Sequence, residues 1–206
     1  MGFTRYWHRQ QTLEQKRFSL WVEEVKELHR WLPPTYKGQP LRIAGPEGIG
    51  EPEFAVECVR LNGSNDQASG GEDMSWESFY VPRVMTLDRF DYPDHAGLFF
   101  SFCKTGHMPY DLLVSAALLQ FAYRFGTMQT HISADGSRDV WTEGQRLCER
   151  VLGDRAGFMP YVVWKKQYDA QGNIVEKSMT EYEDALSDWL DHGRNSDWEQ
   201  NSEEAS

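Results

Sequence analysis

The residue types best suited to chemistry in this 206-residue chain stand together at Cys103-Lys104-Thr105-Gly106-His107. The stretch follows an apolar run and precedes a long apolar segment that begins after Pro109. Where a strand ends and a helix begins, free backbone N–H groups favour an anion. Lys104 would add a positive charge, and Thr105 and Tyr110 would add hydroxyl donors. The stretch is therefore a candidate ligand-binding loop.

The same stretch has two other interpretations. Cys103 stands close to Lys104 and His107 at a predicted helix start, a setting that can lower a thiol pKa and provide a thiolate nucleophile. Cys103 also continues the alternation of the preceding strand, however, so it could face the core within a purely structural joint. The pattern matches neither a phosphate-binding loop nor a known nucleophile motif. The residues therefore favour a structural joint or a ligand-binding loop over a catalytic cysteine.

A second candidate is the loop "GPEGIGEPEF", residues 45–54. Its acids Glu47, Glu51 and Glu53 could face Lys104 across a cleft or hold a hard cation through oxygen atoms. The plainer alternative, which the residues favour, is a solvated or salt-bridged loop. The chain has no Walker A lysine, no Gly-x-Gly-x-x-Gly, no His-Glu-x-x-His and no Cys/His cluster. We therefore predict no metal site, and the sequence leaves any cofactor undetermined.

The formal charge of -11 is concentrated at the C-terminal end. Residues 181–206 hold nine acids against one arginine, which leaves only -3 for the preceding 180 residues. This balance disfavours direct nucleic-acid binding and docking on anionic membranes. The acidic segment is expected to be a partly disordered, solvated tail, with a decoy for a basic partner as the alternative.

Three widely spaced cysteines and an N-terminal stretch without an apolar run predict a soluble, cytoplasmic protein. Residues 1–180 are expected to form a single domain, with residues 153–180 as a C-terminal hairpin extension. Helices and strands are interleaved, but runs of strand, turn and strand dominate the middle of the chain. This order predicts an α+β fold with helices packed on a mainly antiparallel sheet.

Hydrophobic periodicity places the elements within that domain. A capping box at Thr12 and Gln15 predicts a helix that Pro33 ends, and Pro109 opens a long buried central helix that stops at Gly126. A third helix is expected over residues 138–153. Strands are predicted over residues 54–63, 76–85, 98–103 and 128–136, and a β-hairpin over residues 161–179.

The strand at residues 98–103 is apolar on both faces, so we expect it to be central in the sheet. The opening "FTRYW" predicts another short strand with Phe3, Arg5 and Trp7 on one side. If this strand pairs beside the central one, Tyr6 would lie near the Lys104 turn and become a further candidate ligand contact.

The quoted pieces "MGFTRYW", "GEPEF", "FCKTGHMPYD" and "SADGSRDVW" together span about 140 residues. With them the chain resembles a group of small proteins found in bacteria, their phages and some fungi. The resemblance implies a compact soluble α+β domain and an association with phages. It implies no established activity, so no catalytic residue is transferred.

The leading functional hypothesis is a non-enzymatic binding or interaction protein, whose ligand would be a small anionic or nucleotide-like molecule or a protein partner. The alternative is a small cysteine-dependent hydrolase or transferase that uses Cys103 and His107. A second alternative is the acidic decoy formed by residues 181–206.

Overall fold

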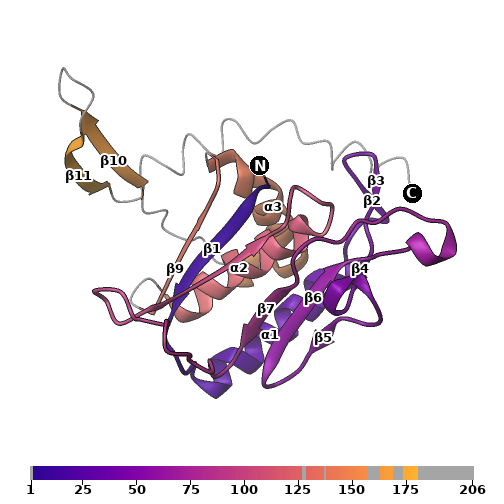
Figure 1. Ribbon diagram of the computed structural model, residues 1–206, viewed down its shortest axis with the longest axis horizontal. Coiled ribbons are helices and arrows are strands. Elements are labelled where there is room, and N and C mark those ends of the chain that lie inside the picture. The colour runs from indigo at the N-terminus through magenta and orange to yellow at the C-terminus, as the bar shows by residue number, and fades with distance from the viewer. Residues whose placement is uncertain (1, 127–128, 137, 157–162, 169–173, 181–206) are drawn as a thin grey trace.

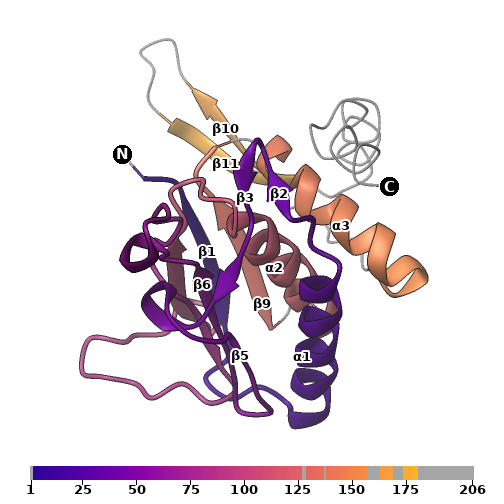
Figure 2. The same cartoon turned by 90° about the vertical axis from the view of Figure 1, so that its right-hand side faces the viewer.

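The computed structural model describes residues 2–126, 129–136, 138–156, 163–168 and 174–180. Within these ranges the chain forms three α-helices and antiparallel strands, which confirms the α+β class (Figure 1). The helices run along one side of the strands, a layering that is clearest in the turned view of Figure 2.

The first sheet has the strand order β8-β1-β9, built from β8 (Phe99–Lys104), β1 (Thr4–Arg9) and β9 (Thr130–Ala134). The N-terminal strand and the strand near residue 130 are therefore confirmed. Within this sheet β1, not β8, is the middle strand, and Arg5 lies between Cys103 and Ala134. The inward-facing side chains of β1 include that of Trp7, which is 1% exposed.

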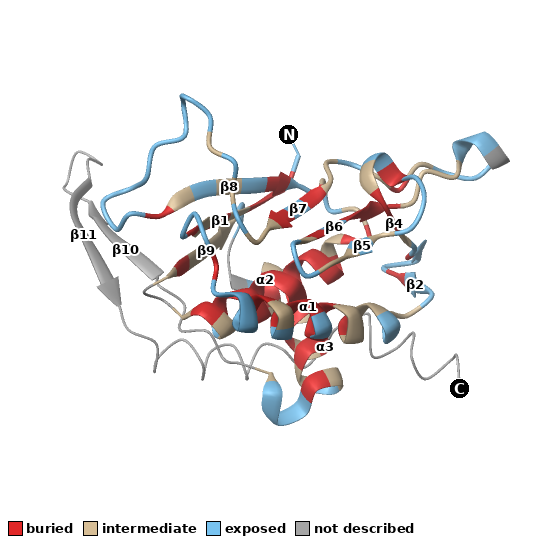
Figure 3. Ribbon diagram, turned by 90° about the horizontal axis from the view of Figure 1, so that it is seen from below, coloured by how far each residue is buried: buried red, intermediate tan, exposed pale blue. Residues whose placement is uncertain are grey.

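The prediction that the 98–103 strand is central and buried on both faces was wrong. In the described part of the chain β8 pairs with β1 alone, and Phe100 and Phe102 are 49% and 48% exposed. Their rings stack on each other, and the Phe100 ring also stacks on that of Tyr6. Figure 3 shows β8 on the side of the molecule away from the helices, with much of the strand coloured as exposed. The run of aromatic residues did not indicate burial, because the rings pack on one another along one face of the strand. Such packing does not need a second layer of structure to cover that face.

The second sheet is organised around β6 (Cys58–Gly63), which pairs with β7 (Phe79–Pro82), β4 (Ile43–Ala44) and β5 (Glu53–Phe54). The predicted 54–63 strand is split into β5 and β6 by a tight turn, in which the Ala55 N–H donates to the Cys58 carbonyl at 2.8 Å. A two-residue pairing joins β2 (Thr35–Tyr36) to β3 (Gln39–Pro40). The Lys37–Gly38 turn between them has φ angles of 52° and 73°.

Helix α1 (Gln15–Arg30) begins later than its predicted cap. Glu14 is the N-cap, and its carboxylate accepts from the backbone N–H groups of Lys16 and Arg17 at 2.8 and 2.9 Å. These bonds lower the Glu14 pKa. The capping box at Thr12 was therefore a wrong prediction, because the Glu14 side chain already satisfies the free N–H groups that Thr12 was expected to bind.

Helix α2 (Asp111–Phe125) stops at Gly126, and α3 (Thr142–Leu152) stops at Gly153, both as predicted. Twelve of the fifteen residues of α2 are buried, since α1 and α3 both pack on it. The indole N–H of Trp21 in α1 donates to the Ala117 carbonyl at 2.9 Å. None of the helices in the described ranges combines the length and apolarity needed to cross a membrane.

Strands β10 (Val163–Tyr168) and β11 (Ile174–Thr180) pair antiparallel, within the range of the predicted hairpin. The predicted turn at residues 169–173 and the acidic segment at residues 181–206 lie outside the described residues. The predicted tail and its alternative as a decoy stay predictions.

Candidate functional site

The turn between β8 and α2 is tied to the start of β1 by its backbone. The N–H groups of Thr105 and Gly106 both donate to the Phe3 carbonyl at 3.0 Å. Gly106 and His107 then adopt φ angles of 60°, the left-handed region that glycine tolerates best. A Cβ added to Gly106 would also come within 3.2 Å of the Trp76 ring, so the turn leaves little room for a larger residue. This geometry places the His107 ring on Phe3, with ring centroids 4.1 Å apart.

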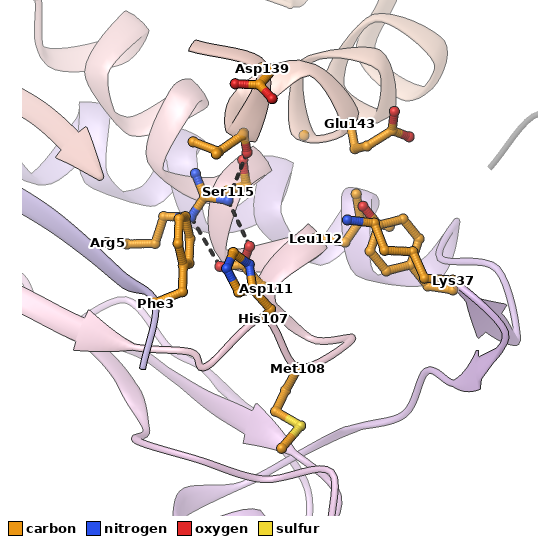
Figure 4. A pocket seen from close by; sticks show the side chains of 13 residues that line it. Phe3, Arg5, Lys37, His107, Met108, Asp111, Leu112, Ser115, Asp139 and Glu143 are labelled. Atoms are coloured by element: carbon orange, nitrogen blue, oxygen red, sulfur yellow. Dashed lines mark hydrogen bonds and ion pairs between the residues drawn. The ribbon is translucent and has the colours of Figure 1, made fainter. Parts of the chain in front are cut away.

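Beneath this turn lies a buried ion pair between Arg5 and Asp111. Arg5 is 2% exposed, and its Nε and Nη2 donate to the two Asp111 carboxylate oxygens at 3.0 and 2.6 Å (Figure 4). The Thr105 hydroxyl donates to the same carboxylate at 2.7 Å. Arg5 Nη2 also donates to the Val140 carbonyl at 2.8 Å. A bidentate pair with these extra hydrogen bonds offsets part of the cost of burying two charges.

Two aromatic rings flank the Arg5 guanidinium. Its central carbon lies 4.7 Å from the Phe3 ring centroid and 4.3 Å from that of Trp141. Cation–π contacts of this kind gain strength when water is excluded. The Arg5 side chain is therefore held in one orientation by Asp111, Val140 and the two rings. Its Nη1 atom, although buried, has no hydrogen-bond partner among the described residues.

A cavity of about 260 Å³ opens beside this ion pair. Its walls come from the start of β1, the β2–β3 turn, the turn before α2, the first turns of α2, and the segment that leads into α3 (Figure 4). Five of the lining side chains are charged, and they are Arg5, Lys37, Asp111, Asp139 and Glu143. The rest of the wall includes the stacked Phe3 and His107 rings, Tyr36, Met108 and Leu112.

The structure does not present Cys103 as a nucleophile. The residue is fully buried, and its thiol donates to the Glu77 carbonyl at 3.3 Å. Burial raises the pKa of the thiol far above its ordinary value, and the Asp111 and Glu77 carboxylates raise it further. Since the thiolate is the reactive form, this environment keeps the thiol protonated. His107, the other candidate catalytic residue, stacks on Phe3 at the cavity wall.

Tyr110 is also fully buried, and its hydroxyl donates to the Glu77 carbonyl at 2.8 Å. Burial raises the pKa of that hydroxyl. Lys104 is half exposed and lies 3.6 Å from the Glu77 carboxylate, while its backbone N–H donates to the same group at 2.9 Å. The carboxylate that faces Lys104 is therefore that of Glu77, whereas the sequence had suggested an acid of the 45–54 loop.

The other predicted contacts lie elsewhere. Tyr6 faces the opposite side of the sheet from Arg5, and its hydroxyl donates to Asp135 at 2.9 Å. Glu51 raises the pKa of the nearby His29, although burial lowers it more. Glu53 accepts from the Cys58 thiol. Of the candidate residues, the structure brings only Thr105 and His107 to the ion pair or its cavity.

Sequence reasoning missed Arg5, Lys37 and Glu143 as site residues. A signal for Arg5 was present, because its position on the inward side of β1 requires a buried charge to find a partner. Asp111 gave no such signal, because an acidic residue just after Pro109 is common at the start of a helix without any site. No local pattern marks Lys37 or Glu143, which reach the cavity from a two-residue strand turn and from the first turn of α3.

Among the described residues, no three His, Cys, Asp or Glu side chains are grouped so that they could hold a metal ion. The wall of the cavity instead combines charged side chains of both signs with an apolar stretch. No protein-family model, no curated protein and no solved structure matches this chain.

Proposed function

We propose that the protein is a non-enzymatic binding protein that takes a small charged ligand into the cavity between β1, the β8–α2 turn and the start of α3. The observation that carries this proposal is the lining of that cavity, in which five charged side chains surround about 260 Å³ of space. Partly buried charged groups lose part of their hydration, and ligand groups of opposite charge replace the lost contacts with water.

The rigidity of one wall supports binding. Arg5 donates hydrogen bonds to Asp111 and to the Val140 carbonyl, and Thr105 donates to the same Asp111 carboxylate. Phe3 and Trp141 flank the Arg5 guanidinium. A wall that is already ordered loses little conformational entropy when a ligand arrives. Lys37 differs, because it is exposed and contacts the Tyr36 ring with its Nζ 5.2 Å from the ring centroid. Its long side chain can adjust to an anionic group of the ligand.

The enzymatic alternative has less support. A cysteine hydrolase or transferase needs an accessible thiolate, whereas Cys103 is buried with a raised pKa. Three free cysteines support a reducing compartment, so we place the binding protein in the cytoplasm. An association with phages stays part of this proposal and rests on the motif resemblance alone.

Native mass spectrometry of the full chain, purified gently from cells, tests the proposal. We expect a mass excess that disappears when the protein is denatured, because a ligand held only by non-covalent contacts leaves with the fold. Added back at 100 times its dissociation constant, the ligand should raise the free energy of unfolding by about 2.7 kcal/mol.

Two lysine variants test whether the bound ligand lies in this cavity. Lys37→Gln should reduce the retained mass excess, because it removes an exposed cation of the cavity without changing the core. Lys16→Gln is the matched control, since Lys16 is an exposed lysine in the first turn of α1, away from the cavity. A bare mass, together with an unchanged melting temperature in the presence of amino acids, carboxylic acids, phosphate and nucleotides, would contradict the proposal.

A further inference from the structure

We propose that two copies of this chain pair through the open face of the sheet β8-β1-β9, around a two-fold axis that brings Lys104 of one copy to Asp94 of its partner. This face lies on the side of the molecule away from the helices (Figure 3). The cavity takes its Arg5 wall from the opposite, inward side of β1. The pairing therefore goes beyond the proposed binding function and does not depend on it.

Five rings form a continuous patch on this side of the sheet, which we call the aromatic face: Tyr6 and His8 of β1, Phe100 and Phe102 of β8, and His131 of β9. The Phe100 ring centroid lies 5.9 Å from those of Tyr6 and Phe102 and 5.2 Å from that of His8. The His8 and His131 rings are 6.0 Å apart. A sheet face that is open to water usually carries polar side chains, whereas aromatic residues are enriched at protein interfaces. The aromatic face therefore has the composition of an interface.

The polar atoms of the aromatic face add little charge to its centre. Burial lowers the pKa of His131, and His8 beside it lowers that pKa further, although Asp94 opposes the shift. A histidine with a lowered pKa is uncharged at neutral pH. The Tyr6 hydroxyl already donates to Asp135 at 2.9 Å. A partner that covers the face would therefore remove mostly ring surface from water, which is the favourable part of association.

Charged groups of opposite sign stand at the two ends of the aromatic face. Lys104 is the last residue of β8, and its Nζ lies 5.9 Å from the Phe102 ring centroid. Asp94 is at the other end, where its carboxylate accepts at 2.9 Å from the N–H of Leu98, the residue before β8. Its charge reaches the face, because it acts on the pKa of His131. A two-fold axis through the middle of the face places each Lys104 against the partner's Asp94, so the surface is complementary to itself.

The same groups disfavour other partners. The Lys104 ammonium lies 3.6 Å from the Glu77 carboxylate, and the carboxylates of Asp94 and Asp135 lie beside the face. A nucleic acid or an anionic membrane needs an excess of cations to replace its counterions, and this surface does not offer one. A second copy of the chain brings an ammonium and a carboxylate to the positions where the first copy has their opposites.

The exposed area indicates how tight the pairing is. An aromatic side chain buries about 150–250 Å² when it is fully covered, so the half-exposed Phe100 and Phe102 offer roughly 200 Å² together. A standard interface takes about 800 Å² from each partner. The two rings are thus the centre of an interface rather than the whole of it. We expect a reversible dimer with a dissociation constant in the micromolar range.

Sedimentation velocity of the full chain tests the pairing directly. The concentration is varied from about 1 to 300 μM, a range that spans micromolar dissociation constants. We expect the average mass to rise with concentration from that of one chain toward that of two, without larger species, because a two-fold interface is closed. A chain that sediments as a single copy at every concentration overturns the proposal and leaves the aromatic face to another protein or to a segment of the same chain.

Two variants place the interface on the aromatic face. Phe100→Thr and Phe102→Thr should each weaken the dimer about tenfold or more, because each removes a ring from its centre while threonine still favours a strand. Tyr123→Gln is the matched control, since Tyr123 is an exposed aromatic residue of α2 in the helix layer, and it should leave the dimer unchanged. Circular dichroism and the melting temperature show that each variant keeps its fold. A dimer that persists in both folded phenylalanine variants forms elsewhere, which overturns the proposal.

A double-mutant cycle tests the two-fold arrangement. Lys104→Gln and Asp94→Asn should each weaken the dimer about fivefold, because the pair occurs twice in the interface. Asparagine keeps an oxygen that can accept from the Leu98 N–H, so the local turn is preserved. The double variant should be no weaker than either single one, since both changes remove the same contact. Losses that simply add would show that the two side chains do not meet, and the proposed arrangement would be wrong. Ligand retention in the cavity should stay unchanged in every variant, so the two proposals succeed or fail separately.

Discussion

Asp111 organises the site at the level of single residues. Its carboxylate accepts from two nitrogen atoms of Arg5 and from the Thr105 hydroxyl, so one side chain connects β1, the β8–α2 turn and the first turn of α2. A buried charge that loses its partner typically costs a protein about 3–5 kcal/mol. The site therefore depends on a pair whose members stand 106 positions apart in the chain.

Cysteine reactivity tests the residue-scale interpretation of Cys103. Native protein treated with iodoacetamide should be labelled first at Cys58, because Cys58 is partly exposed whereas Cys103 and Cys148 are buried. Burial and the Glu53 carboxylate raise the pKa of Cys58 to about 11. Its labelling rate should therefore rise about tenfold per pH unit from pH 8 until the pH approaches that pKa.

Peptide mapping of the labelled protein measures the order of reaction, and Cys58→Ser should leave the native chain almost unlabelled. Rapid native labelling of Cys103 would contradict the burial argument and would favour the cysteine-enzyme alternative. In denaturant all three thiols should react at similar rates, because the environments that raise their pKa values are lost.

At the scale of elements, the close approach of α2 and α3 depends on Gly144. A Cβ added there would lie 2.4 Å from Ser115 Oγ and 2.9 Å from the Ala116 backbone nitrogen. The Cys148 thiol, one turn later in α3, donates to the Ala116 carbonyl at 3.5 Å. Because Ser115 and Gly144 both line the cavity, this helix contact also positions Glu143 against it.

Gly144→Ala should lower the free energy of unfolding by about 1–3 kcal/mol, because the added methyl group forces the two helices apart. The loss would appear even though alanine favours a helix by about 1 kcal/mol over glycine. Urea denaturation followed by circular dichroism measures the change. Glu23→Ala on the exposed side of α1 is the control and should stay within about 0.5 kcal/mol. An unchanged or higher stability for Gly144→Ala would show that α2 and α3 can separate without cost.

At the scale of the whole molecule, the two sheets are joined through Arg9. Its fully buried guanidinium donates to the carbonyls of Gln10, Gln11, Pro82 and Arg83, which links the end of β1 to the segment after β7. Burial lowers its pKa to about 10. Trp7 packs on Phe79 across the same junction, with ring centroids 5.4 Å apart. The sheets and helices thus share one core.

Among the residues whose burial the structure describes, the buried members of that core cluster run from Trp7 to Leu152. A chain that ends after Ala156 should therefore unfold cooperatively, with a urea midpoint close to that of the full chain. Equilibrium denaturation followed by tryptophan fluorescence and by circular dichroism gives both observations. A broad transition, or a clearly lower midpoint, would show that residues after Ala156 contribute to the core, in line with the predicted domain of residues 1–180.

Local signals were sufficient for several parts of the fold. The alternation in "FTRYW" predicted β1 with Phe3, Arg5 and Trp7 on one side, and glycines at positions 126 and 153 predicted the ends of α2 and α3. These predictions were confirmed because strand alternation and helix termination depend on residues only a few positions apart. The α1 cap was predicted wrongly, although it is also local, because Glu14 competes with Thr12 for the same N–H groups.

The sequence by itself determined the fold class, the placement of Arg5 on the same side of β1 as Phe3 and Trp7, and the ends of the main helices. Only the tertiary structure decided that β1, rather than β8, lies in the middle of its sheet, and that Arg5 meets Asp111. It alone brought Lys37 and Glu143 to one cavity. The physical reason is that these arrangements come from packing between elements far apart in the chain, and the spacing of residues within any one element carries no record of that packing.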